Sequence, residues 1–192
     1  GGFVQFSFTF VESGEQSFPS SKNDTGLAIS NASTATIEAA KTDFAKKFSI
    51  ANRPQFVADS ARTKIQDFSN KVAGLAKTYT STTNSISDFA FTVSNLTANV
   101  NDLMNKPDEL AEQMASAMNF LKRSGGKVSE TLGAMKSLLG FGDNDKPVSQ
   151  TTPSRQAEAK NQTTLNDLVK QVSLSESVQA ASEVEFASVD EA

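Results

Sequence analysis

This 192-residue sequence contains no cysteine, no histidine and no tryptophan. Without cysteine, the chain can form neither a disulfide framework nor a thiolate nucleophile. Without histidine, it can form no catalytic triad or dyad that needs an imidazole, and no zinc site built from histidine and cysteine. Any catalysis would therefore have to come from carboxylate, lysine, serine or tyrosine side chains.

The sequence also lacks long apolar runs and a large excess of either charge. Its formal net charge is −4 and its pI is about 4.9, which gives no field for steering toward phosphates. The basic pairs Lys46–Lys47 and Lys122–Arg123 are isolated, and we interpret both as solvated helix faces. No apolar stretch reaches the length that spans a membrane. We expect neither a membrane span nor nucleic-acid binding by this segment.

Two short motifs resemble functional sites but lack essential residues. The stretch "SGGK" at 124–127 matches the serine–lysine spacing of some acylating enzymes, but the companion motifs of those enzymes are missing. The stretch "DNDKPV" at 143–148 resembles the start of a calcium loop. It lacks glycine at the sixth position and glutamate at the twelfth, where Ser154 stands. We interpret the first as a helix boundary and the second as a polar turn. We predict no enzyme and no catalytic, cofactor-binding or metal site.

The first residues of the chain have the alternation of a half-buried β-strand. In "GGFVQFSFTFVESG" the side chains of Val4, Phe6, Phe8 and Phe10 would share one face. Nothing else in the sequence resembles a strand, so we predict that residues 1–12 belong to a larger β-rich domain. Its partner strands would lie in a missing part of the protein or in another chain. The sequence is thus expected to be an interior segment of a longer protein.

The remaining residues predict a mainly α fold, a helical hairpin or bundle. We expect a linker at 13–32, a helical region at 33–140, a second linker at 141–152, and a long helix at 153–192. A serine or threonine at 33–34 would cap the first helix of the helical region. Within the helical region, two apolar seams are joined by a short polar link and predict an antiparallel hairpin. The first seam consists of Val57, Ile65, Phe68, Val72 and Leu75, and the second of Ile86, Phe89, Val93, Leu96, Val100 and Leu103.

The later helices are expected to bury narrower apolar stripes. The expected stripe of the helix after Pro107 contains Leu110, Met114, Ala117 and Leu121; the next contains Val128, Leu132, Met135 and Leu139; the last contains Leu165, Leu168, Val172, Val178 and Phe186. Three phenylalanines, Phe3, Phe18 and Phe141, flank the predicted strand or loop segments. They are candidates either for anchors that contact a partner or for local packing.

Three segments, 1–20, 43–61 and 152–192, together resemble the DNA circularisation protein N family of Mu-like phages and prophages. Members of that family carry a strand of the form G-G-x-x-x-F-x-x-x-F-x-E-x-G-x-x-x-x-P after a β-rich domain. This pattern is matched here by Gly1, Gly2, Phe6, Phe10, Glu12, Gly14 and Pro19. Residues from about 62 to 151 match only in character, as a variable helical insert.

The resemblance implies a structural component of a contractile phage tail, in the baseplate between the tail tube and the central hub. Such a protein would be part of the virion, be assembled in the host cytoplasm, form a homo-oligomeric ring and contact other tail and baseplate proteins. The family pattern carries no active-site residues.

Two other interpretations stay open. The family name implies a protein that travels with injected DNA and holds its ends together. For this segment, Lys64, Lys71 and Lys77 fall along one side of a predicted helix, but Asp59 and Asp67 lie among them and leave little net field. The third interpretation is a helical adaptor unrelated to phages.

Overall fold

The computed structural model describes residues 25–79, 83–124 and 127–182, and the regular structure within these ranges is entirely helical. The mainly α prediction is therefore confirmed. The helices are α1 (Thr25–Lys47), α2 (Gln55–Tyr79), α3 (Thr83–Ala98), α4 (Val100–Met104), α5 (Pro107–Ser124), α6 (Val128–Leu139) and α7 (Pro153–Ser182). The predicted strand at 1–12, with its face of Val4, Phe6, Phe8 and Phe10, lies outside the described residues.

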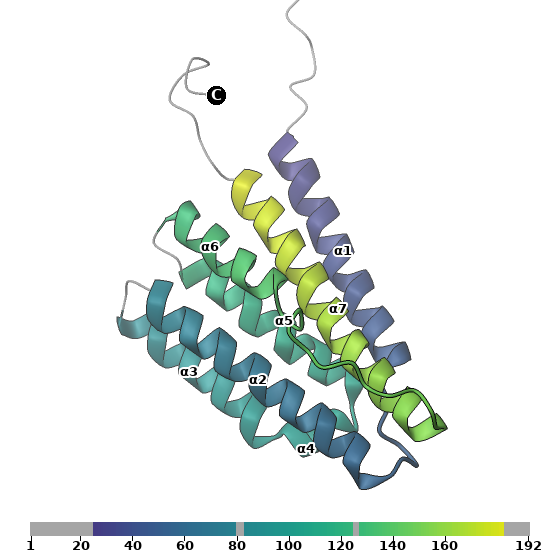
Figure 1. Ribbon diagram of the computed structural model, residues 1–192. Helices are drawn as coiled ribbons and strands as arrows, with labels where there is room; N and C mark the ends of the chain where they lie inside the picture. The colour runs from purple at the N-terminus through teal and green to yellow at the C-terminus, as the bar shows by residue number, and fades with distance from the viewer. Residues whose placement is uncertain (1–24, 80–82, 125–126, 183–192) are drawn as a thin grey trace, which may run out of the picture.

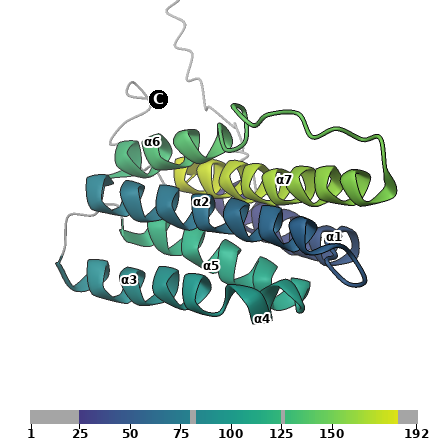
Figure 2. The same cartoon turned by 60° about the horizontal axis from the view of Figure 1, so that its bottom comes forward.

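The helices lie side by side in an elongated bundle (Figures 1 and 2). Helix α7 contacts α1, α2, α5 and α6, while α1 lies at one edge of the bundle and contacts only α7 and α5 among the described helices. Helices α1 and α7 are antiparallel, because Ser30 contacts Gln179 near one end and Ser49 contacts Asn161 near the other. The long C-terminal helix is thus packed into the bundle along the length that the structure describes.

Helices α2 and α3 pack against each other on either side of a short connection, as a hairpin would. The residues of the first seam are buried, except for Leu75, which is half-buried against the core. In the second seam Leu96, Val100 and Leu103 are buried and Val93 is half-buried. The side chains of Ile86 and Phe89 are not among those that the structure describes. The seam continues across the break at Asn99, since the amide of Leu103 still donates to the Asn99 carbonyl at 2.9 Å.

One cluster of buried apolar side chains joins α1–α7. All four methionines of the chain, Met104, Met114, Met118 and Met135, are at most 2% exposed. Their flexible side chains fill the irregular space that small residues leave between helices. Phe44 and Phe48 stack with ring centroids 5.0 Å apart and anchor the end of α1 in this core. Full burial of one such side chain contributes about 1.5–3 kcal/mol.

Helix α1 begins earlier than the sequence indicates. Its first turns occupy the second part of the segment 13–32, which we expected to be a linker. Serine and threonine are weak helix formers, but here Thr34 and Thr36 donate their hydroxyl hydrogens to the carbonyls of Ser30 and Ala32. Because this part of α1 also lies along α7, tertiary contacts outweigh the weak local preference.

Two predicted stripes differ from the observed buried faces. In α6, Leu138 and Thr131 are buried while the expected Leu132 and Leu139 are half-buried. In α7, Val178 is 45% exposed, and the helix is described only as far as Ser182, so Phe186 lies outside the described residues. The buried face of α7 runs through Val172, Glu176 and Ala180 instead. This path was missed because a glutamate breaks the apolar pattern that the prediction follows.

The segment that follows α6 is held against the bundle as a polar turn. Phe141 is buried and meets Phe68 edge-on, with centroids 5.9 Å apart, which shows local packing for this ring. Asp145 binds the buried ammonium group of Lys64 at 2.5 Å and accepts a hydrogen bond from Asn166 at 2.9 Å. Gly142 adopts a φ of +84°, in the left-handed region that favours glycine.

We expect Gly142→Ala to lower the free energy of unfolding by about 2 kcal/mol, because a non-glycine residue is strained in the left-handed region. A Cβ at this position would also lie 2.2 Å from Nδ2 of Asn166. Urea denaturation followed by circular dichroism measures the change.

The matched control is Gly140→Ala. At Gly140 φ is −81° and an added Cβ would meet Asp143 Oδ2 at an ordinary 3.5 Å. This variant should unfold close to the wild-type midpoint. Equal destabilisation by both variants would show that the left-handed turn at Gly142 is not what fixes the segment.

Candidate functional site

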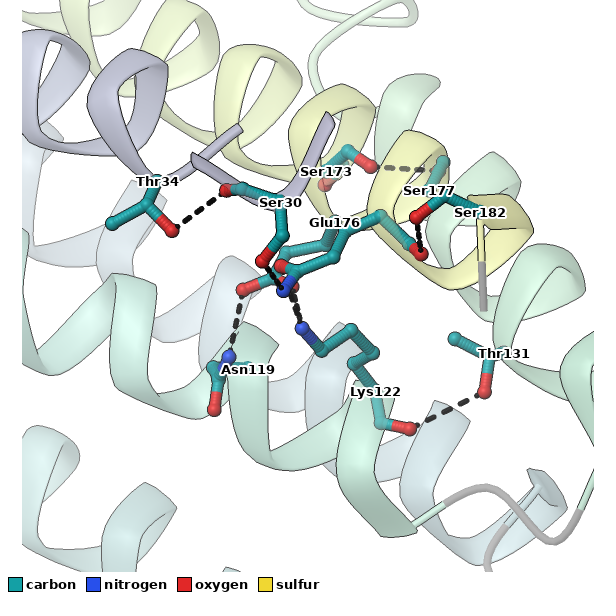
Figure 3. Close-up of polar contacts among 10 residues, drawn as sticks. Ser30, Thr34, Asn119, Lys122, Thr131, Ser173, Glu176, Ser177 and Ser182 are labelled. Atoms are coloured by element: carbon teal, nitrogen blue, oxygen red, sulfur yellow. Dashed lines mark hydrogen bonds and ion pairs between the residues drawn. The ribbon is translucent and has the colours of Figure 1, made fainter. Parts of the chain in front are cut away.

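A polar groove of about 470 Å³ lies between α1 and α5, with α7 beneath it, and charged side chains from all three helices line it. Figure 3 shows its inner contacts, to which α1, α5 and α7 all contribute. The charged residues that line it are Glu38, Lys41, Glu112, Lys122, Arg123 and Glu176. Its cations and carboxylates are therefore equal in number.

Glu176 is the innermost charged residue of the groove and is only 2% exposed. Its Oε2 lies 2.7 Å from Nζ of Lys122, whose side chain is 11% exposed. Its Oε1 accepts a hydrogen bond of 2.9 Å from the amide of Asn119. The Oε2 atom receives no hydrogen bond of good alignment, so its attraction to Lys122 is mainly electrostatic. This geometry contradicts the interpretation of Lys122 as a solvated residue, whereas Arg123 is exposed.

Hydrogen bonds extend from this ion pair to the neighbouring helices (Figure 3). Lys122 donates to Oε1 of Gln179 at 2.9 Å, and Gln179 donates to the hydroxyl of Ser30 on α1 at 3.0 Å. The hydroxyl of Thr131 on α6 donates to the backbone carbonyl of Lys122 at 3.3 Å. The network thus links α1, α5, α6 and α7 around one buried charge pair.

The outer part of the groove is more acidic. Nζ of Lys41 lies 2.6 Å from a carboxylate oxygen of Glu38 and 2.5 Å from one of Glu112. Burial lowers the pKa of Lys41, but the hydrogen bonds to Glu112 and Glu38 outweigh this effect, and the net result is a raised pKa. A neighbouring hollow of about 710 Å³ along α1 and α5 adds the carboxylates of Asp108 and Glu109.

The chemistry of this groove is ion pairing between helices. No group of three or more carboxylates in the described ranges is arranged to hold a metal ion. Lys41 is engaged by two carboxylates, and Lys122 by Glu176 and Gln179, so both ammonium groups already have partners within the chain. We assign the groove a structural role in fixing α1 and α7 against α5.

The seam residues whose side chains the structure describes pack in the hairpin and the core, and none of them lines the groove. The three lysines that a DNA-binding surface would need differ in their exposure to solvent. Lys64 is 6% exposed, and its ammonium group lies 2.5 Å from Asp145 and 4.3 Å from the centre of the Phe141 ring. Lys71 is half-buried and Lys77 is exposed. None of the described helices is long and apolar enough to cross a membrane.

Glu176 and Lys122 are the residues that sequence reasoning missed. A signal was present, because Glu176 stands four residues after Val172 and four before Ala180, on the stripe that begins at Leu165. A charged residue on an apolar stripe of a helix indicates a buried partner of opposite charge. The identity of that partner depends on which helix packs there, and local sequence does not supply this information.

No protein-family model, curated protein or solved structure gives a significant match to this chain.

We expect Glu176→Gln to lower the free energy of unfolding by about 2–4 kcal/mol, because it leaves the largely buried Lys122 without its counter-charge. Lys122→Met should cost a similar amount by leaving Glu176 unpaired. The double variant should recover most of the loss, since no unpaired charge then remains. Urea unfolding of all four proteins gives the coupling energy.

The exposed pair of Lys106 and Glu109 provides the control for this cycle. The two side chains are 58% and 52% exposed and lie 2.9 Å apart, so substituting them should show no measurable coupling. If the losses at positions 122 and 176 simply add in the double variant, the buried pair is not an interacting unit.

The raised pKa of Lys41 predicts a loss of stability in alkali. A raised pKa in the folded protein contributes stability that is fully present below the unfolded value of 10.5 and is lost as pH rises through the folded value. The stability difference between the wild type and Lys41→Met should therefore shrink as pH rises above 10.5. Urea unfolding at neutral and alkaline pH measures this difference, and a pH-independent difference would contradict the role of the charge.

Proposed function

We propose that this chain is a structural, non-enzymatic component of a contractile phage tail baseplate. It would join the tail tube to the central hub through contacts between copies of itself and with other tail proteins. In this proposal the protein belongs to the virion and is assembled in the host cytoplasm. The resemblance of segments 1–20, 43–61 and 152–192 to the DNA circularisation protein N family is its starting point.

The observation that supports the proposal most directly is that two of these segments meet in space. The amide side chain of Asn161 accepts a hydrogen bond from the Ser49 backbone amide at 3.0 Å and donates one to the Ser49 carbonyl at 2.9 Å. Nearby, the guanidinium carbon of Arg155 lies 4.5 Å from the centre of the Phe56 ring. Segments 43–61 and 152–192, which are far apart in the sequence, thus form one joint, as a shared structural role would require.

The electrostatics of the described surface favour this function over DNA-end binding. A DNA-binding segment needs cations gathered on one face. Here Lys64 is neutralised by Asp145, Lys122 by Glu176, and Lys41 by two glutamates. The outer groove is acidic and would repel phosphates. DNA-end binding therefore remains an alternative without a supporting observation in the described residues.

Mass spectrometry of purified virions or tail-like particles tests the proposal. We expect peptides from this sequence in stoichiometric amounts with other baseplate proteins. Their absence from particles that contain the rest of the baseplate would contradict the proposal and favour a helical adaptor unrelated to phages. Tight, salt-sensitive retention of DNA by the chain in a filter-binding titration would instead favour the DNA-end alternative.

A further inference from the structure

Helix α1 is joined to the bundle in an unusual way. It contacts α7 and α5 but makes no contact with α2, the next helix along the chain, in the part of the molecule that the structure describes. Figure 1 shows α1 at the edge of the bundle, with α7 between it and α2. Contacts within the chain therefore fix the position of α1 only through segments that are distant in sequence. A second copy of the chain offers the same α5 and α7 surfaces.

The connection between α1 and α2 contains a strained turn. Asn52 has a φ of 55°, the only positive φ among the described non-glycine residues. The turn closes through one long hydrogen bond of 3.3 Å, from the Arg53 amide to the Ile50 carbonyl. Pro54 follows, and a proline disfavours helical geometry in the residue before it, so Arg53 lies outside both helices. Short connections under strain promote the exchange of an element between copies.

The segment that would move with α1 has a defined end. The two hydrogen bonds between Asn161 and the Ser49 backbone hold Phe48 and Ser49 against α7. Phe48 is 2% exposed and stacks on Phe44. Residues up to Ser49 therefore dock as one unit with α1, and residues 50–54 form the hinge.

The surface that α1 buries is compatible with transient exposure to water. Of the α1 side chains, only Ser33, Ala40 and Phe44 are fully buried. Its contacts with α5 and α7 include polar ones, from Ser30 to Gln179 and from Lys41 to Glu112. Release of residues 25–49 would expose the buried apolar side chains of Ala40, Phe44 and Phe48, and the exchanged form buries them again in the second copy.

We propose that α1 is exchanged between two copies of this chain, so that residues 25–49 of one copy pack on α5 and α7 of the other. We call the arrangement with α1 packed on its own chain the closed form. In the exchanged dimer each α1 makes the same contacts with the other copy. The closed form and the exchanged dimer therefore differ in the hinge at 50–54 and in any new contact between the two bundles. Opening the hinge releases the left-handed conformation of Asn52. The partner for this surface is a second copy of the same chain. This inference goes beyond the baseplate proposal and does not depend on it.

Because the chain contains no cysteine, introduced cysteines report exchange without background. One chain carries Ser30→Cys and a second chain carries Gln179→Cys, at positions whose side chains lie 3.0 Å apart in the closed form. The two chains are mixed in urea, refolded together at high concentration and treated with a short bis-maleimide. We expect a covalent dimer that contains one copy of each chain. Failure to form this mixed dimer would overturn the proposal.

The matched control pairs Asp143→Cys in one chain with Lys170→Cys in another. These exposed side chains lie 2.7 Å apart, and both belong to the part of the fold that stays together when α1 is exchanged. The control chains should give no mixed dimer. A mixed dimer of equal yield from the control pair would show association without exchange of α1 and would also overturn the proposal.

Substitutions in the hinge test the cause of exchange without any cross-link. Asn52→Gly removes the strain of the closed turn and should lower the dimer fraction measured by sedimentation velocity. Asn52→Val disfavours the positive φ and should raise the dimerisation constant by about tenfold or more, since each dimer opens two hinges. Equal dimer fractions for the two variants would show that the hinge does not control association and would contradict the proposal.

Discussion

Helix α7 packs against four neighbouring helices, and it does so through both apolar and polar side chains. Leu165, Leu168 and Val172 enter the apolar cluster, while Asn161 and Glu176 carry polar contacts to α1 and α5. A buried polar atom without a partner costs free energy comparable to a lost hydrogen bond. Each polar contact therefore restricts how α7 can slide or rotate against its neighbours. The positions of α1, α5 and α6 follow from this restriction.

Lys64, which is buried, and Lys122, which is half-buried, show how charge fixes parts of the chain that are far apart in sequence. Lys64 of α2 holds the segment after α6 through Asp145, and Lys122 of α5 holds α7 through Glu176. Buried ion pairs add little net stability, because desolvation offsets most of the attraction. They do penalise any arrangement in which one partner is buried alone. We infer that the two ion pairs of this protein contribute more to selecting one register of the helices than to the free energy of unfolding.

The proposed baseplate role and the proposed exchange of α1 both involve the joint where α1 ends. Asn161 and the Ser49 backbone join two segments that resemble the same family. The same hydrogen bonds define where the exchangeable unit stops and the hinge starts. An assembly built from copies of one chain gains a strong mutual contact when a helix crosses between neighbours, because the full intramolecular interface becomes an interface between subunits.

The sequence by itself determined where α2, α5 and α7 begin. Pro54, Pro107 and Pro153 mark three helix starts because proline fixes its own φ and restricts the residue before it, and these effects are local. The spacing of apolar residues likewise indicated the core positions of α2 and α5, since helical geometry sets which residues share a face. Tertiary structure decided the early start of α1, the burial of Lys122 and Glu176, and the left-handed turn at Gly142. Each of these depends on a partner far away in the sequence, and a buried charge or a weak helix former is stable only when that partner is in place.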